Sequence, residues 1–157
     1  MSGDLILGVD PGKTGALAVW SPALGLVDVH DMPEATGAAL GALVRELIAD
    51  YEPESFRLAV VEDVHSMPKQ GVRSVWTFAL GHGSVLGALG ALHVPVQLVT
   101  PAVWKKAMGL SKDKNASRQR AIEVWPAEAA RFARVKDDGR AEAALLTQWP
   151  NGKKETM

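Results

Sequence analysis

The chain of 157 residues contains no cysteine, which excludes disulfide bonds and thiolate metal sites. Any metal ion that it binds must therefore take its ligands from aspartate, glutamate or histidine side chains. No apolar run approaches the about 20 residues that a membrane-spanning helix needs, and the N-terminus lacks the basic start of a secretion signal. These absences predict a cytoplasmic globular protein about one domain in size, with no membrane partner.

Neither sign of charge dominates the chain as a whole, and its formal net charge is -1. The distribution is uneven, because residues 1–100 carry 5 Lys and Arg against 11 Asp and Glu, whereas residues 101–157 carry 12 against 7. Such a split favours acidic chemistry in the first part and a surface for a polyanion in the second. Solvated helix faces of opposite sign would give the same counts.

The segment GVDPGKTG at residues 8–15 has some features of a phosphate-binding loop. Such a loop needs four residues between its first glycine and the Gly-Lys pair, whereas only three separate Gly8 from Gly12. Asp10 would also place a carboxylate among phosphate oxygens. We therefore expect this loop to orient Asp10 toward a metal ion, and we expect no nucleotide cofactor.

Alternating apolar strands and amphipathic helices predict a layered α/β domain built on a mixed sheet. The first three strands follow one another at hairpin distances, which indicates antiparallel pairing. One domain is expected over residues 1–150, followed by a flexible tail at 151–157. The expected strands are 5–10, 15–20, 26–32, 57–62 and 95–100, and the expected helices are 37–50, 72–92, 101–108, 116–125 and 138–149.

Two carboxylates, Asp10 and Glu62, stand at the C-terminal ends of apolar strands. If these strands are neighbours in one sheet, their ends lie about 5 Å apart. Asp138 and Glu142 are four residues apart and therefore share one face of a helix. Carboxylates that converge without a compensating lysine need a cation, and hard oxygen ligands suit Mg²⁺ or Mn²⁺. Two such ions can activate a water and stabilise the leaving oxygen of a phosphodiester, which predicts a phosphodiesterase site.

Each of these acids also has a simpler structural explanation. An aspartate at the end of a strand is commonly a turn former, and Asp138 alone would serve as a helix N-cap. Glu142 alone would be a solvated helix residue. The four acids occur in order, each on the kind of element that a site requires, and this combination favours the metal site.

The same residues resemble the RuvC family of Holliday-junction resolvases, and in particular its phage and phage-like branch. The resemblance implies a ribonuclease H-like fold with a five-stranded mixed sheet flanked by helices. It also implies a homodimer that binds a four-way DNA junction and makes paired, symmetric nicks, leaving 5′-phosphate and 3′-hydroxyl ends, in a bacterial or phage-infected cytoplasm. The matching segments cover most of the chain in the family's order: GVDPGKTGALAVW, AVVEDVHSMPKQGVRS, LGHGSVLGALGALHVPVQLVTPAVWKKAMGL, DKNASRQRAIEVWP and KDDGRAEAALL.

The resemblance assigns catalysis and the binding of two Mg²⁺ or Mn²⁺ ions to Asp10, Glu62, Asp138 and Glu142. The last acid in this family is usually an aspartate, so Glu142 is a departure that affects the geometry of the site. The preceding ligand lies three, four or five residues earlier in different members. We choose Asp138 for its spacing from Glu142 and keep the adjacent Asp137 as the alternative.

Basic residues cluster where the resemblance implies DNA, and they would bind phosphates with a strong dependence on salt. Gly83, Gly87 and Gly90 recur at helical spacing although glycine weakens a helix. This pattern indicates close packing, either against the sheet of the same subunit or, as the family implies, across the dimer interface. The predicted DNA-binding residues are Lys69, Arg73, Lys105, Lys106, Lys112, Lys114, Arg118 and Arg140.

Three other interpretations share part of these features. A RuvC-like nuclease that acts on RNA or on other branched DNA would have the same fold and the same acids. An actin-like ATPase also carries an aspartate after its first strand, but it needs two such lobes to enclose a nucleotide. A non-catalytic junction-binding module would keep the basic residues, and its properties would not depend on Asp10.

Overall fold

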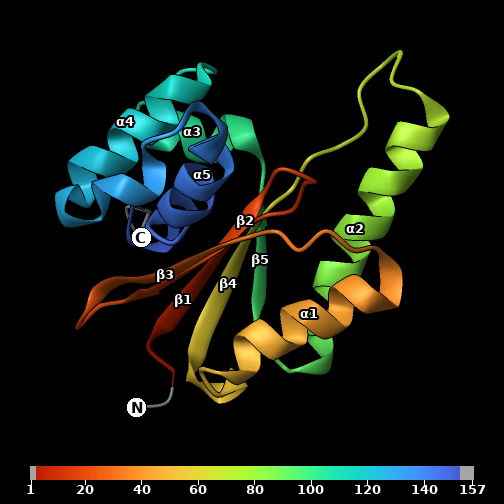
Figure 1. Ribbon diagram of the computed structural model, residues 1–157, viewed down its shortest axis with the longest axis horizontal. Coiled ribbons are helices and arrows are strands. Elements are labelled where there is room, and N and C mark those ends of the chain that lie inside the picture. Colours follow the sequence, from red (N-terminus) through yellow and green to blue (C-terminus); the bar gives the residue numbers. More distant parts are fainter. Residues whose placement is uncertain (1–2, 153–157) are drawn as a thin grey trace, which may run out of the picture.

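A computed structural model describes residues 3–152 of the chain. Its centre is one five-stranded sheet with the strand order β3-β2-β1-β4-β5 (Figure 1). β1 pairs antiparallel with β2 and β2 with β3, whereas β4 pairs parallel with both β1 and β5. The expected mixed sheet with three antiparallel strands is confirmed. The strands are β1 (Leu5–Asp10), β2 (Ala16–Ser21), β3 (Gly25–Asp31), β4 (Phe56–Glu62) and β5 (Val96–Val99).

Helices cover both faces of the sheet, as expected (Figure 1). On one face α1 packs against α2, and on the other α4 packs against α5, which lies across β1, β2 and β3. Between Trp125 and Asp138 the chain forms 3-10 turns, which the sequence patterns did not predict. The helices are α1 (Gly37–Ala49), α2 (Val72–Ala91), α3 (Pro101–Ala107), α4 (Lys114–Val124), α5 (Asp138–Leu146) and the short α6 (Trp149–Gly152).

Two helix boundaries differ from expectation by more than one residue, for local reasons. α4 begins earlier because the side chain of Asp113 accepts a 2.9 Å hydrogen bond from the backbone nitrogen of Asn115 and caps the helix. α5 ends at Leu146, and the Thr147 hydroxyl donates a hydrogen bond to the carbonyl oxygen of Ala144. The predicted single helix over 138–149 is therefore two helices, α5 and α6.

Alternation of side chains along the strands divides the core into two parts. Leu7 and Val9 of β1 pack toward α1 and α2, whereas Ile6 of β1 and Val60 of β4 pack toward α4 and α5. Because side chains at every second position share a face, the acids that end β1 and β4 continue the row of Ile6 and Val60. Both acids therefore face the side of the sheet that α5 covers.

Two glycines allow α5 to lie directly on the sheet. A Cβ atom on Gly8 of β1 would collide with the backbone carbonyl of Ala143, and one on Gly139 of α5 would collide with the carbonyl of Thr14. A backbone carbonyl cannot move aside as a flexible side chain can. The close contact of α5 with β1 therefore requires glycine at position 8, and its contact with the loop that follows β1 requires glycine at position 139.

None of the helices within residues 3–152 is long and apolar enough to cross a bilayer. Positions 151 and 152 of the expected tail belong to α6, and positions 153–157 lie outside the described residues.

Gly8→Ala is expected to lower the free energy of unfolding by about 3 kcal/mol, because the new methyl group must displace the backbone of α5. Chemical denaturation followed by circular dichroism measures the change. Gly41→Ala in α1 is the matched control, since a Cβ atom there meets its nearest neighbour at an ordinary 3.7 Å. A loss from Gly8→Ala no larger than that from the control would contradict the close packing of α5 on β1.

Candidate active site

The two strands that end in acids are neighbours, as the sequence analysis required. β1 and β4 pair in parallel with Val9 opposite Val61, and Asp10 and Glu62 are the next residues of the two strands. Glu62 is buried, with 5% of its surface exposed. The sheet thus places two carboxyl groups at one edge, on the face covered by α5.

Two adjacent side chains of α3 contact acids of the site, one of them Glu62 and the other Glu142. The indole Nε1 of Trp104 donates a 2.8 Å hydrogen bond to Oε2 of Glu62. The ammonium group of Lys105 lies 2.7 Å from Oε1 of Glu142. The expectation that the acids converge without a compensating lysine is therefore wrong.

The sequence analysis gave Trp104 no role at the site and assigned Lys105 to DNA. Pro101 begins α3 directly after β5, which pairs with β4, so that the helix starts beside the end of the strand that carries Glu62. That placement was the signal from which both side chains could have been assigned to the site.

Asp138 and Glu142 lie one turn apart on α5, as their spacing predicts. Glu142 is 8% exposed and accepts a 3.3 Å hydrogen bond from the hydroxyl of Ser117 on α4. Asp138 is the first residue of α5, and one of its oxygens lies 3.5 Å from the ammonium of Lys114. The N-terminal part of α5, which carries these two acids, lies near Asp10 at the end of β1.

Asp137, the alternative to Asp138, is bound to Arg134 instead. Only 1% of Asp137 is exposed, and its carboxylate accepts 2.8 Å hydrogen bonds from both the backbone nitrogen and the guanidinium of Arg134. Burial alone would raise the pKa of Asp137, but the hydrogen bonds and charge of Arg134 hold it below its usual value. This carboxylate therefore serves the turn that leads into α5.

The pKa shifts of Asp10 and Glu62 reflect their burial and the charges of neighbouring acids. Burial raises the pKa of Asp10 well above its usual value, and the negative charges of Glu62, Glu142 and Asp138 raise it further. Lys105 acts in the opposite direction on Asp10. Burial also raises the pKa of Glu62, although the hydrogen bond from the Trp104 indole opposes the rise. Glu62, Asp138 and Glu142 therefore all lie close enough to Asp10 for their charges to act on it.

Within residues 3–152, no three Asp, Glu or His side chains are already arranged to hold one metal ion together. The chemistry of the donor set nevertheless fits a hard divalent cation, because these four side chains offer only carboxylate oxygens and crowd one another in a partly buried place. A cation bound among them would relieve the repulsion that raises the pKa of Asp10.

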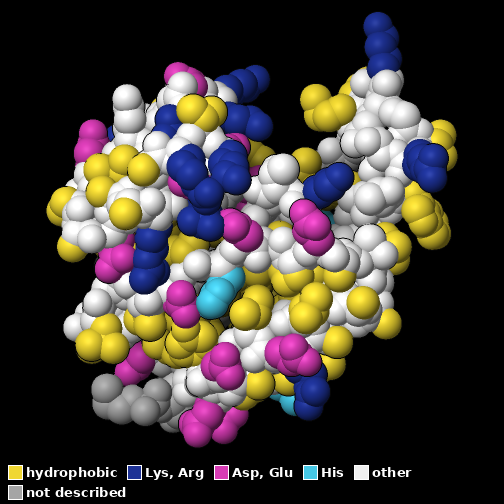
Figure 2. All heavy atoms as spheres, viewed as in Figure 1, with side chains coloured by type: hydrophobic (Ala, Val, Ile, Leu, Met, Phe, Trp, Pro, Cys, Tyr) yellow, Lys and Arg dark blue, Asp and Glu magenta, His cyan; other side chains and the backbone are white. Residues whose placement is uncertain are grey.

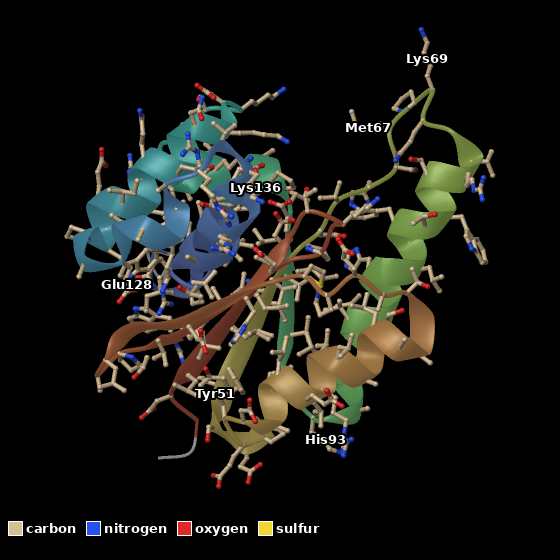
Figure 3. All side chains as sticks on the ribbon, viewed as in Figure 1. Tyr51, Met67, Lys69, His93, Glu128 and Lys136 are labelled. Carbon is tan, nitrogen blue, oxygen red and sulfur yellow. The ribbon has the colours of Figure 1, made fainter. Side chains whose placement is uncertain are left out.

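The predicted DNA-binding residues lie on two sides of a hollow. Figure 2 shows the surface hollowed between a lobe, formed by α3, α4 and α5, and an arm, formed by the loop 63–71 and the start of α2. Lysine and arginine side chains gather on the lobe (Figure 2). Lys69 lies at the tip of the arm and points away from the body of the protein (Figure 3). Arg73 lies in the first turn of α2, and Lys106, Lys112 and Lys114 belong to the lobe and are exposed.

Two arginines among the predicted DNA contacts, like Lys105 and Lys114, have partners inside the subunit. The guanidinium of Arg140 donates hydrogen bonds of 2.7 and 2.8 Å to the carboxylate of Asp31, which ties α5 to β3. Arg118 donates to the carbonyl oxygen of Ala133 at 2.9 Å and to the side chain of Asn115 at 2.8 Å. Both arginines position the elements that carry or support the acids.

Gly83, Gly87 and Gly90 are exposed on α2, and a Cβ atom on any of them would meet nothing within 4 Å. The alternative that these glycines pack closely against the sheet of the same subunit is therefore wrong. Three large apolar side chains are exposed on the same helix, Val72 at 87%, Trp76 at 69% and Leu80 at 39%.

Solved structures share this fold. The structure of T. thermophilus RuvC in complex with Holliday junction substrate matches with a TM-score of 0.68 and 19% sequence identity, over 94% of each chain. A Thermus thermophilus RuvC structure matches with a TM-score of 0.63 and 21% identity, over 94% of this chain and 95% of that one. The chain has the ribonuclease H-like fold of RuvC. Comparisons with models of protein families and with the sequences of curated proteins find no match.

Asp10→Asn is expected to raise the melting temperature of the metal-free protein at neutral pH. The raised pKa of Asp10 means that its ionisation destabilises the fold, so wild-type stability falls as pH rises from the unfolded pKa near 4 through the folded pKa. The difference in melting temperature between Asp10→Asn and wild type should therefore grow with pH and vanish below about pH 4. Thermal denaturation in EDTA over this range measures it.

Asp137→Asn is the contrasting control, because the pKa of Asp137 is lowered and its carboxylate stabilises the fold at neutral pH. We expect the free energy of unfolding of this variant to fall by about 1–2 kcal/mol, because the buried side chain at position 137 then pairs with Arg134 without a charge. If Asp10→Asn also melted below wild type at neutral pH, the acids would not be crowded as described.

Proposed function

We propose that the protein is a divalent-metal-dependent endonuclease that resolves four-way DNA junctions as a homodimer. The observation that carries the proposal is the convergence of Asp10, Glu62, Asp138 and Glu142 at one edge of a RuvC-like sheet. Membership of the phage-like branch remains a prediction from the sequence segments.

In this proposal the four acids hold the catalytic cations. Two Mg²⁺ or Mn²⁺ ions would supply an activated water and a stabilised leaving oxygen for hydrolysis of a phosphodiester. The chain itself holds the ligands in place: Trp104 fixes one oxygen of Glu62, and Ser117 donates to Glu142. Asp138 is favoured over Asp137 because Arg134 already occupies the carboxylate of Asp137.

The hollow between the lobe and the arm suits an extended polyanion. Its acidic edge is flanked on the lobe by exposed lysines, and the arm carries Lys69 and Arg73. These cations would bind phosphates and place one strand of the junction over the acids. The RuvC structure that shares the fold over 94% of the chain was solved with Holliday junction substrate, which supports the same class of substrate here.

The exposed face of α2 supports the proposed homodimer. Its glycines are not used for packing within the subunit, and Gly83 lines a shallow groove with Gly41 of α1 and Leu80. Val72 and Trp76 extend this apolar face toward the arm. A two-fold symmetric contact uses the same patch on both subunits, so one self-complementary face is sufficient. Such a dimer would carry two sites, as paired nicks require.

A nuclease that acts on other branched DNA or on RNA would share the fold and the acids, and the choice of substrates in the assay separates these alternatives.

Asp10→Asn and Glu62→Gln are expected to reduce cleavage by about 100-fold or more, because each removes a proposed metal ligand. End-labelled four-way junction, linear duplex, flap DNA and RNA duplex are incubated with Mg²⁺ or Mn²⁺, and the products are resolved on denaturing gels. Paired symmetric nicks are expected in the junction alone.

Asp138→Asn should lose cleavage in the same assay, whereas Asp137→Asn should retain it once the folded fraction is taken into account. Undiminished cleavage by Asp10→Asn would overturn the proposed site. Preferential cleavage of flap DNA or RNA would replace the junction as substrate.

Gly83→Leu is expected to convert the dimer into a monomer, because the new side chain would fill the face where two α2 helices meet. The subunit itself has room for it. Size-exclusion chromatography with light scattering gives the mass of each variant, and Ala42→Leu at an exposed position of α1 is the control. A dimeric Gly83→Leu protein would place the interface elsewhere, and a monomeric wild type would contradict the homodimer.

A further inference from the structure

Lys105 lies among the site carboxylates, unlike the other lysines of the lobe. Only 17% of its side chain is exposed, and its ammonium lies 2.7 Å from Oε1 of Glu142. Its neighbour Lys106 is exposed, and the structure shows no ion pair for it within residues 3–152. Lys114, which approaches Asp138 at 3.5 Å, is 77% exposed. Lys105 is thus a partly buried cation among the site carboxylates, which a role as a phosphate contact alone does not explain.

The surroundings of Lys105 hold its ammonium in this place. The preceding residue, Trp104, is completely buried, and its indole is fixed by the hydrogen bond to Glu62. The ammonium lies 5.5 Å from the centroid of the same indole ring, within the range of a cation–π contact. One short helix therefore contacts two of the four acids through adjacent side chains, a donor for Glu62 and a positive charge for Glu142.

We propose that Lys105 is an internal counter-cation of the active site: in the metal-free protein its ammonium neutralises and restrains Glu142, and a divalent ion must displace it from Glu142 to bind. This inference rests on the proposed function, because it takes Glu142 as a metal ligand.

Replacement of the Lys105 ammonium by a divalent ion has an electrostatic basis. Buried carboxylates that repel one another destabilise the fold unless a positive charge lies among them. Lys105 provides that charge in the metal-free protein, so the acids can lie close together when no metal ion is bound. A divalent ion carries twice the charge and accepts several carboxylates at once, which lets it replace the ammonium. Displaced from Glu142, Lys105 remains beside Lys106 on α3, where it can contact a phosphate.

The decisive experiment measures metal binding without DNA. Lys105→Met removes the charge and keeps an apolar stem against the Trp104 ring, and Lys106→Met removes the same charge one residue away. Isothermal titration of each full-length variant with Mn²⁺ should give a Kd roughly tenfold tighter for Lys105→Met than for wild type, because the ion no longer competes with an ammonium. Lys106→Met should stay within about twofold of wild type, since its charge lies in solvent.

Metal-free stability gives an independent readout. Lys105→Met should melt below wild type in EDTA and regain the difference in excess Mn²⁺, whereas Lys106→Met should melt as wild type does in both. A Kd for Lys105→Met that equals or exceeds the wild-type value would overturn the inference, because Lys105 would then not compete with the metal.

A second variant covers the case in which Lys105→Met does not fold without metal. Lys105→Gln keeps a hydrogen-bond donor for Glu142 and should show the same tightening of the Kd for Mn²⁺. Recovery of folded Lys105→Met only in Mn²⁺ would support the exchange of one cation for another. Failure of both variants to fold even in Mn²⁺ would overturn it, because the ion could not then replace the lysine.

The same titrations separate this inference from the proposed function. If wild type and both Lys105 variants bind no Mn²⁺, the proposed nuclease function fails and the inference fails with it. If wild type binds Mn²⁺ and cleaves the junction, while Lys105→Met binds no more tightly, the inference alone is lost.

Discussion

The close approach of α5 to β1 is the constraint on which the rest of the structure depends. It requires glycine at position 8 of the strand, because a methyl group there would meet the carbonyl of Ala143, and the adjoining contact of α5 with the loop after β1 requires glycine at position 139 for the same reason. Small residues of α5 make these contacts, since the backbone of Ala143 lies over Gly8 and Gly139 lies over Thr14. With a larger separation, Glu142 would stand away from the strand ends and the four acids could not influence one another. The packing of one helix therefore decides whether the site exists.

That packing creates an electrostatic cost, which the surrounding residues reduce. Carboxyl groups that are partly withdrawn from water repel one another, and the raised pKa of Asp10 reflects both effects. The compensation comes from three side chains of α3 and α4: the Trp104 indole, the Lys105 ammonium and the Ser117 hydroxyl. Repulsion among carboxylates is unfavourable locally, and such local costs are typical of functional sites, where the rest of the structure supplies the stability.

The sheet and the positions of the acids could be predicted because both depend on short-range patterns. Apolar runs marked β1 and β4, and the period of two placed the terminal acids on the face that α5 covers. The partners of the charged residues could not be predicted in this way. Arg140 pairs with Asp31 across 109 residues of sequence, and Lys105 reaches Glu142 only through the packing of α3 beside α5. A charge count treats such residues as solvated cations, although the tertiary structure gives them specific partners.

The order of the elements along the chain has a consequence for biosynthesis. Asp10 and Glu62 leave the ribosome early, whereas α5 follows every other element of the site. A nascent chain without α5 leaves one apolar face of its sheet uncovered, including Ile6 and Val60, and is prone to aggregation until the helix arrives. The same chain lacks half of the acids. The four acids can therefore come together only after α5 has been synthesised.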